Sequence, residues 1–267
     1  MPWFDVGVNL LDPRFDIPTL IQESVAHQVT DILVIASDIN ESEQALSQAD
    51  NWLDVHLGKQ SNSIFNLHYT AGVHPHYADA TNSDSWIKLE ALLADTRVSA
   101  VGECGLDFNR NYSTQKNQIE AFQKQLQLAV KHQKGLYLHE RDAFDTQISL
   151  LQNVYKKVPF LVTHCFTGNT EKLKAYLELG CYIGVTGWVC DDKRGQELAQ
   201  ALEHLPLNRL LLETDSPYLF PKTVRPRAKM NSPKYIEAIA QKVAEIKGIS
   251  LEQVAQAAYA NAKALFK

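Results

Sequence analysis

Eight short apolar segments recur along the chain, and longer amphipathic stretches separate them. The segments are rich in Val, Ile, Leu, Tyr and Phe and are bounded by Gly, Pro, Asn or Asp, a pattern typical of buried strands. Strands that alternate with helices predict a parallel sheet, and eight such units over about 250 residues favour a (β/α)8 TIM barrel. The expected strands are Trp3–Leu10, Ile32–Ala36, Tyr69–Val73, Val98–Glu103, Gly135–His139, Phe160–His164, Cys181–Val185 and Leu210–Thr214.

A doubly wound open sheet also alternates strands with helices and is the alternative fold. The even distribution of the strands and the lack of a Gly-rich nucleotide turn favour the barrel. Two helices have clear limits, since Thr114–His132 begins with a capping residue and Pro233–Lys247 is followed by Gly248. Ser250 and Gln253 form a capping box that begins a last helix.

Length and composition fit one soluble domain. The chain has 267 residues, 45% of them hydrophobic, with no linker-like stretch, so we expect a single domain over residues 1–267. A net charge of -5 means that any nucleic-acid contact must come from a local basic patch. No apolar run approaches the ~20 residues of a membrane helix, and the first residues do not resemble a secretory signal. Cysteines without a C-x-x-C pair indicate reduced thiols and a cytoplasmic protein; they are Cys104, Cys165, Cys181 and Cys190.

Polar residues lie at, or directly after, the carboxyl ends of five of the expected strands. The carboxyl ends of barrel strands meet on one face, where active sites are built. We therefore expect these side chains to lie close together. They are His74 and His76, Glu103, His139, His164, and Glu213 with Asp215.

Histidines and carboxylates gathered in this way are typical of a divalent-metal site. Imidazole and carboxylate suit Zn, Mn, Fe or Ni, and a larger share of carboxylate favours Mn or Mg. Without a cation, Glu103 and Asp215 would repel each other and one would take up a proton. With a cation, Asp215 can serve as general base for a bound water, and His74 can contact substrate or protonate a leaving group.

Each of these residues also has a purely structural interpretation when it is taken alone. A histidine at a strand end can be a hydrogen-bonded core residue, Glu103 can pair with Arg141, and Asp215 can cap the next segment. Four separate strand ends that each offer a metal-ligand type favour the metal site over these alternatives. Cys104 and Cys165 follow ligand positions directly, so strand alternation turns them away from the site.

Several motifs resemble those of the TatD-type metal-dependent deoxyribonucleases. The resemblance covers essentially the whole chain in order. The motifs are Gly72-Val73-His74-Pro75, Gly102-Glu103-Cys104-Gly105-Leu106-Asp107, Thr163-His164-Cys165-Phe166-Thr167-Gly168, Glu213-Thr214-Asp215-Ser216-Pro217-Tyr218 and Asn261-x-x-x-Leu265-Phe266.

The resemblance implies a metal-dependent TIM barrel that hydrolyses phosphodiester bonds in DNA, as an exonuclease on single-stranded or frayed ends. It implies that Glu103, His139, His164 and Asp215 are metal ligands. His74 is then a catalytic or phosphate-contacting residue. His76, which lies beyond a proline in a loop, is a further candidate for phosphate binding, with a structural role as the alternative. Glu213 is implied as an accessory catalytic acid.

The first strand departs from the family pattern. Most members carry a His-x-His pair there, whereas this chain has Gly7 and Asn9, a change that fits the branch after which the family is named. Gly7 offers no side-chain ligand, and Asn9 offers only a weak carbonyl oxygen. We therefore expect one well-held ion, Mg or Mn in preference to Zn, with a second and weaker ion completed by substrate phosphate. Further on, Met230 and Ser232 replace an Arg and a Glu of the family.

The segment after the eighth strand is rich in basic residues. In a barrel it lies at the rim of the active face, where it would attract a polyanion despite the acidic total. We expect Arg225 and Arg227 to bind phosphate. Aromatic residues on neighbouring loops could stack a base; these are Phe108, Tyr112, Trp188 and Tyr218. A solvated loop and core aromatics are the alternative.

A metal-dependent deoxyribonuclease is the leading functional hypothesis. The same ion and water could attack a carbonyl, so an ester or amide hydrolase such as a D-aminoacyl-tRNA deacylase is the second. A barrel without catalysis that binds a partner is the third. We expect DNA as the partner, with RNA or aminoacyl-tRNA as alternatives, a monomer, and no membrane association.

Overall fold

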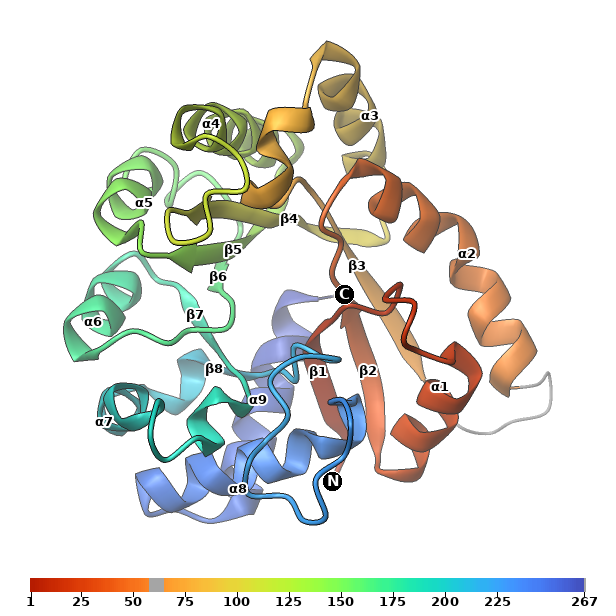
Figure 1. Ribbon diagram of the computed structural model, residues 1–267, viewed down its shortest axis with the longest axis vertical. Coiled ribbons are helices and arrows are strands. Elements are labelled where there is room, and N and C mark those ends of the chain that lie inside the picture. The colour runs from red at the N-terminus through yellow and green to blue at the C-terminus, as the bar shows by residue number, and fades with distance from the viewer. Residues whose placement is uncertain (58–64, 267) are drawn as a thin grey trace.

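The computed structural model describes residues 1–57 and 65–266. Its eight strands form one parallel sheet in the order β1 to β8, with helices outside the ring (Figure 1). The strands are β1 Trp3–Val8, β2 Val29–Val34, β3 Asn66–Ala71, β4 Val98–Asp107, β5 Gly135–Arg141, β6 Leu161–Thr163, β7 Tyr182–Val185 and β8 Leu210–Leu212. The helices are α1 Ile17–Ala26, α2 Ile39–Leu57, α3 Ser83–Leu93, α4 Gln115–His132, α5 Phe144–Leu151, α6 Thr170–Glu178, α7 Gln196–Glu203, α8 Ile236–Lys247 and α9 Leu251–Leu265.

The sheet closes between β1 and the segment that follows β8. Val8 bridges to Ser216 in the parallel sense, and the Asp215 N–H donates to the Gly7 carbonyl at 2.9 Å. The (β/α)8 barrel is confirmed, and the open doubly wound sheet is wrong. A single domain over residues 1–267 stays a prediction.

The helix limits follow the capping residues. Thr114 caps α4, Gly248 ends α8 with φ 64°, and Ser250 begins α9 in a capping box, as predicted. Helix α4 ends at His132, as predicted, and Gln133 follows it with a left-handed φ of 52°. One limit differs from expectation, because a 3-10 turn over Pro233–Tyr235 delays the start of α8.

Strand β4 is four residues longer than predicted. Beyond Glu103 the backbone no longer pairs on both sides, and buried glutamine side chains replace the missing partners. The Leu106 N–H donates to Gln147 Oε1 at 3.1 Å, and the Asp107 N–H donates to Gln118 Oε1 at 2.8 Å. Because these backbone groups stay satisfied, the strand continues into the mouth of the barrel.

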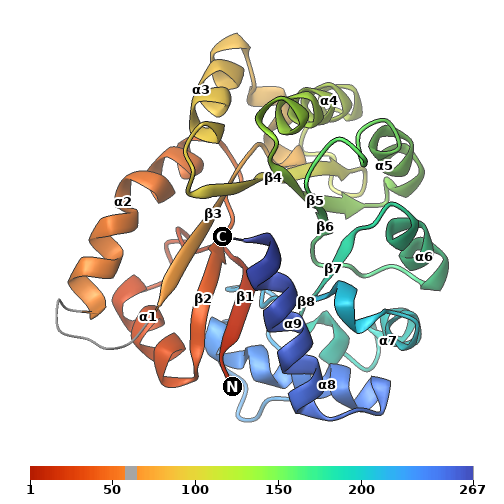
Figure 2. The same ribbon diagram turned by 180° about the vertical axis from the view of Figure 1, so that it is seen from behind.

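The barrel interior is packed at one end and polar at the other. Phe266, after α9, packs with interior residues such as Phe4 and Val6, and Figure 2 shows the C-terminus entering the ring from that side. The main core lies between the strands and the surrounding helices. The polar strand ends lie at the opposite face, which is the position of active sites in this fold. Within the described chain, no helix is long and apolar enough to cross a membrane.

Candidate metal and catalytic site

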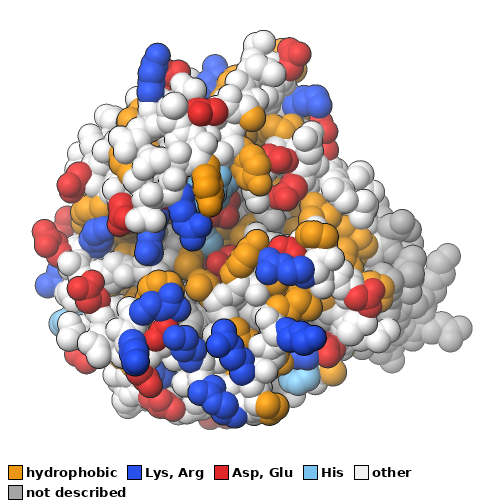
Figure 3. All heavy atoms as spheres, in the orientation of Figure 1, with side chains coloured by type: hydrophobic (Ala, Val, Ile, Leu, Met, Phe, Trp, Pro, Cys, Tyr) orange, Lys and Arg blue, Asp and Glu red, His pale blue; other side chains and the backbone are white. Residues whose placement is uncertain are grey.

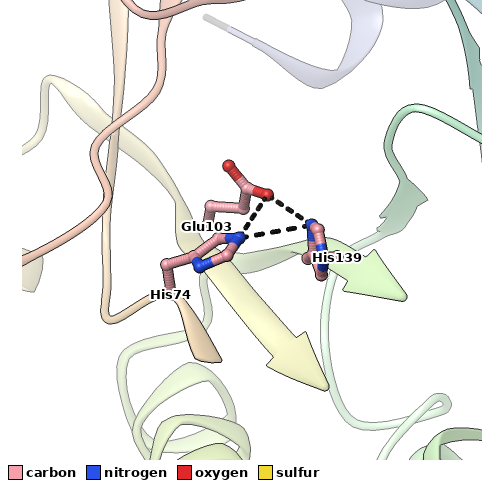
Figure 4. A group of neighbouring side chains, drawn as sticks. All are labelled: His74, Glu103 and His139. Carbon is pink, nitrogen blue, oxygen red and sulfur yellow. Dashed lines mark hydrogen bonds and ion pairs between the residues drawn. The ribbon is translucent and has the colours of Figure 1, made fainter. Parts of the chain in front are cut away.

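Glu103 is the centre of the polar group at this face. Its Oε1 lies 2.8 Å from His139 Nδ1, 3.0 Å from His164 Nε2 and 3.3 Å from His74 Nε2. Figure 4 shows the carboxylate between the rings of His74 and His139, which come from the segment after β3 and from β5. Residues from four different parts of the barrel therefore meet at one oxygen, as the sequence predicted for a closed ring of strands.

His139 and His164 each have a carboxylate beside the ring nitrogen that is turned away from Glu103. His164 Nδ1 faces Glu213 Oε2 at 3.2 Å, and His139 Nε2 lies 3.4 Å from Asp107 Oδ2. A carboxylate behind the ring keeps the ring proton on the outer nitrogen, which leaves the inner nitrogen free to bind a cation. This arrangement favours His164 as a metal ligand. For His139 the Asp107 carboxylate lies in the corresponding place, but among the described residues His139 Nε2 has no hydrogen-bond partner.

His74 is arranged in the opposite way. Its Nδ1 accepts a hydrogen bond from the His76 backbone N–H at 3.1 Å. A neutral imidazole carries one proton, so the proton of His74 lies on Nε2, the nitrogen that faces Glu103. The ring atoms of His74 lie close enough to Glu103 and His139 to form a metal-binding group, but this tautomer favours a proton donor over a ligand.

The donor set fits a divalent ion. Ligand atoms about 2.1 Å from a tetrahedral ion are about 3.4 Å apart. The separations around Glu103 Oε1 are 2.8 to 3.3 Å, slightly tighter than this value. A cation at this point would also replace the hydrogen bonds that now join the inner nitrogens to the carboxylate. The chemistry of two imidazoles and a buried carboxylate therefore suits a metal.

Asp215 lies beside this group, where its carboxylate accepts from Asn9 Nδ2 at 3.2 Å. Burial raises the pKa of Asp215 to about 7, and the negative charges of Glu103 and Glu213 act in the same direction. The repulsion predicted between two carboxylates is thus relieved at Asp215. Asn9 turns its amide N–H toward this carboxylate, so it serves as a donor.

The pKa values of the other groups follow from the same charges. Burial by itself would raise the pKa of Glu103. The electrostatic interactions with His164 and His74 outweigh this effect and hold the pKa of Glu103 well below its usual value. Burial would lower the pKa of His164, but Glu103 and Glu213 raise it well above its usual value. Burial lowers the pKa of His74 to about 4 despite the nearby Glu103, so His74 is neutral at pH 7.

Glu213 lies behind the site and is fully buried. Its Oε2 accepts from the Tyr137 hydroxyl at 2.6 Å and faces His164, while its Oε1 accepts from the Cys165 N–H. This position holds His164 in place and leaves no room for substrate. It therefore favours a positioning role over the catalytic acid that the resemblance implied.

Gly7 makes room for this buried carboxylate. A Cβ on Gly7 would lie 2.4 Å from Glu213 Oε2 and 2.7 Å from the Tyr137 hydroxyl. The space next to the first strand is thus filled by Glu213 and Tyr137. A side-chain ligand cannot occupy position 7 in this chain.

Sequence reasoning missed Asp107 and Tyr137. Asp107 Oδ2 lies 2.7 Å from His76 Nε2 as well as near His139, so it connects the two histidines. Its place at the end of the Gly102–Asp107 motif, just after the fourth expected strand, is a usable signal. Tyr137 gave none, because a tyrosine inside an apolar strand looks like a core residue.

The rim of the site carries exposed aromatic and basic side chains. Tyr112 is 64% exposed and packs edge-on against His76, and Tyr218 is 49% exposed. Phe108 packs against the core instead. In Figure 3, His and acidic side chains are visible in the hollow at the centre of this face, and Lys and Arg side chains gather below it.

The basic segment after β8 is partly neutralised. Lys222 pairs with Asp191 at 2.6 Å and Lys234 pairs with Glu23 at 2.8 Å. Arg225 is exposed, and its Nη1 donates to the Lys222 and Val224 carbonyls. Arg227 is also exposed, so both predicted phosphate-binding arginines lie at the surface.

Comparison with known sequences identifies the family. The sequence model described as "TatD related DNase" matches residues 4–267. The chain belongs to this family. A relative from Edwardsiella piscicida, named "3'-5' ssDNA/RNA exonuclease TatD", is 40% identical over 267 residues, which cover 98% of each chain. A relative with the same name from Salmonella typhimurium is 39% identical and covers 99% of this chain and 98% of its own.

Solved structures of TatD relatives have the same fold. A TatD homologue from Escherichia coli, YJJV, superposes with a TM-score of 0.85 at 25% identity and covers 99% of this chain and 97% of its own. A TatD family hydrolase from Entamoeba histolytica gives a TM-score of 0.86 at 23% identity, with coverage of 100% and 98%. The predicted family, fold and nuclease class are confirmed by these comparisons.

Proposed function

We propose that this chain removes nucleotides from the 3' end of single-stranded DNA and RNA, using one divalent ion. The observation that carries the proposal is the arrangement of His139 and His164, each with a carboxylate behind it and Glu103 in front. The names of relatives at about 40% identity support the substrate and the direction. A binding barrel without catalysis would have no need of this arrangement.

We propose Glu103, His139, His164 and Asp215 as the ligands, with Mg or Mn as the ion. When bound, such an ion lowers the pKa of water and polarises a phosphoryl oxygen. Since Gly7 leaves no room for a ligand on β1, a second ion would depend on substrate phosphate. The number and identity of the ions stay predictions.

The remaining side chains have separate tasks. His74 holds its proton on Nε2, facing the site, so it can protonate the leaving oxygen or bind the scissile phosphate. Asp215 has a pKa near 7 without metal and can take a proton from the attacking water. His76, tied to Asp107, lies at the edge where it can contact phosphate. Tyr112 and Tyr218 are exposed and can stack bases of a single strand.

The test uses single-stranded DNA and RNA labelled at either end. With 5'-labelled strands we expect a ladder that shortens one nucleotide at a time, and with 3'-labelled strands immediate release of a labelled mononucleotide. A stepwise ladder from the 3'-labelled strands would mean removal of nucleotides from the 5' end and would refute the proposed direction. Failure to cleave either polymer with Mg, Mn or Zn, together with turnover of an acyl substrate, would refute the nuclease. A monomeric state and a cytoplasmic location stay predictions.

A further inference from the structure

Arg141 lies at the mouth of the barrel next to the metal site. It ends β5 two residues after His139, and side chains two apart on a strand project from the same face. In the sheet it pairs with Asp107, which itself contacts His139. Arg141 is half-buried, so part of the residue is exposed to solvent.

The guanidinium of Arg141 has no acidic partner. Within the described parts of the chain, no carboxylate lies at ion-pair distance from it, whereas Arg14 pairs with Asp12 and Arg194 pairs with Asp191. The Glu103–Arg141 pair considered from the sequence is therefore wrong. In the described parts of the chain, the Arg141 side chain makes one hydrogen bond, from Nη1 to Thr167 Oγ1 at 3.4 Å, which is long.

Trp188 fixes the direction of this guanidinium. The Arg141 Cζ lies 5.7 Å from the Trp188 ring centroid. Trp188 is itself held, because its Nε1–H donates to the Arg194 carbonyl at 3.2 Å and the Arg194 guanidinium packs over the ring at 4.4 Å. Arg141 thus points toward the loops after β6 and β7, which carry Thr167 and Trp188. Among the residues that the structure describes, no carboxylate lies within ion-pair distance of its remaining donors.

A half-buried cation without a counter-ion is costly unless an anion arrives from outside. The planar donors of arginine match the oxygens of a phosphate group. Since the guanidinium contacts Thr167 and Trp188 and no ion pair joins it to the proposed ligand carboxylates, it fits a phosphate next to the reacting one.

We propose that Arg141 binds the phosphate one nucleotide to the 5' side of the scissile phosphate. This inference rests on the proposed nuclease function and assigns a binding subsite to it. Trp188 is a positioning residue in this subsite, where it holds the guanidinium, rather than a base-stacking platform as its sequence suggested.

The test is a double-mutant cycle between the protein and the substrate. One strand carries normal linkages, and the other carries an uncharged methylphosphonate at the neighbouring phosphate. We measure kcat and KM for release of the first 3' nucleotide by the wild type and by Arg141→Ala. Each change alone should raise KM about tenfold, as expected for one charge-assisted hydrogen-bonding contact. For Arg141→Ala acting on the methylphosphonate strand, KM should be no higher than with either change alone.

A second readout separates binding from stability. Fluorescence anisotropy with a chelator present gives the dependence of DNA binding on salt, and loss of one phosphate contact should lower the logarithmic slope by about 0.7. Arg141→Lys should keep the slope but not the full affinity, because it keeps the charge and loses the planar donors. If Arg141→Ala does not fold, Arg141→Gln takes its place in the cycle.

Arg209 is the matched control. It packs over Tyr182 at 4.7 Å, but it lies just before β8, at the opposite end of the barrel. Arg209→Ala should change neither KM nor the salt slope. Additive effects of Arg141→Ala and the methylphosphonate, or an unchanged slope, would overturn the assignment of Arg141. Absence of nucleotide release by the wild type from the unmodified strand would instead refute the proposed function.

Discussion

The hydroxyl of Tyr137 is the most informative group to remove. It donates to Glu213 Oε2 at 2.6 Å and lies 2.8 Å from the Val6 carbonyl oxygen, inside a fully buried part of the barrel. Tyr137→Phe keeps the ring and removes only the hydroxyl with its contacts to Glu213 and Val6. Glu213 then retains the Cys165 N–H and the outer nitrogen of His164.

The expected magnitude follows from the charge of the acceptor. A hydrogen bond to a charged group contributes about 1.5–3 kcal/mol, and loss of a partner behind a ligand lowers metal affinity about 10–100-fold. Since tenfold corresponds to about 1.4 kcal/mol, the two ranges agree. Tyr137→Phe should therefore raise the Kd for Mn by about 10–100-fold, because Glu213 holds His164 less firmly.

The assay is calorimetric titration of metal-stripped protein with Mn. Tyr176→Phe is the control, since Tyr176 is also fully buried but its hydroxyl contacts Gln147 outside the site. That variant should bind Mn as tightly as the wild type. Wild-type affinity in Tyr137→Phe, or equal losses in both variants, would refute the reasoning that Glu213 acts through His164.

Three further predictions concern packing, protonation and charge. Gly7→Ala should destabilise the fold by about 1–3 kcal/mol, because its Cβ would overlap Glu213; a melting temperature equal to the wild type would contradict this. Burial raises the pKa of Asp5 to about 7, so the fold should lose stability as the pH rises from about 4 to about 7. Melting curves of metal-free Asp5→Asn should show a smaller loss over this range, and an equal loss would argue against a protonated Asp5. Changing Arg225 and Arg227 to Ala should weaken DNA binding and lower its salt dependence together, and an unchanged salt slope would count against phosphate contact.

The barrel and the place of the site could be predicted from the sequence, because both depend on periodicity. Eight apolar segments set the number of strands, and the polar residue at each strand end had to meet the others once the ring closed. His139, His164 and Glu103 were found in this way. The extra length of β4 could not be foreseen from the sequence. It depends on the side chains of Gln118 and Gln147, which reach the β4 backbone from helices α4 and α5.

The roles of individual residues required the structure. Sequence spacing does not tell which nitrogen of a histidine faces the centre, and this distinguishes His74 from His139 and His164. Burial of Glu213 likewise favours a positioning residue over a catalytic acid. The sequence shows a glycine at position 7 in place of a histidine. It does not show that the space beside Gly7 is filled by Glu213, which lies about two hundred residues away in the chain.

Metal dependence tests the central claim most directly. Metal-stripped protein is titrated with Mg or Mn while hydrolysis of end-labelled single-stranded DNA and the bound metal are measured in the same samples, with Glu103→Ala and His164→Ala in parallel. The account predicts no hydrolysis before addition, activity that rises with the first equivalent bound, and neither binding nor activity in Glu103→Ala. Full hydrolysis by the stripped protein, or normal metal-activated hydrolysis by Glu103→Ala, would contradict it.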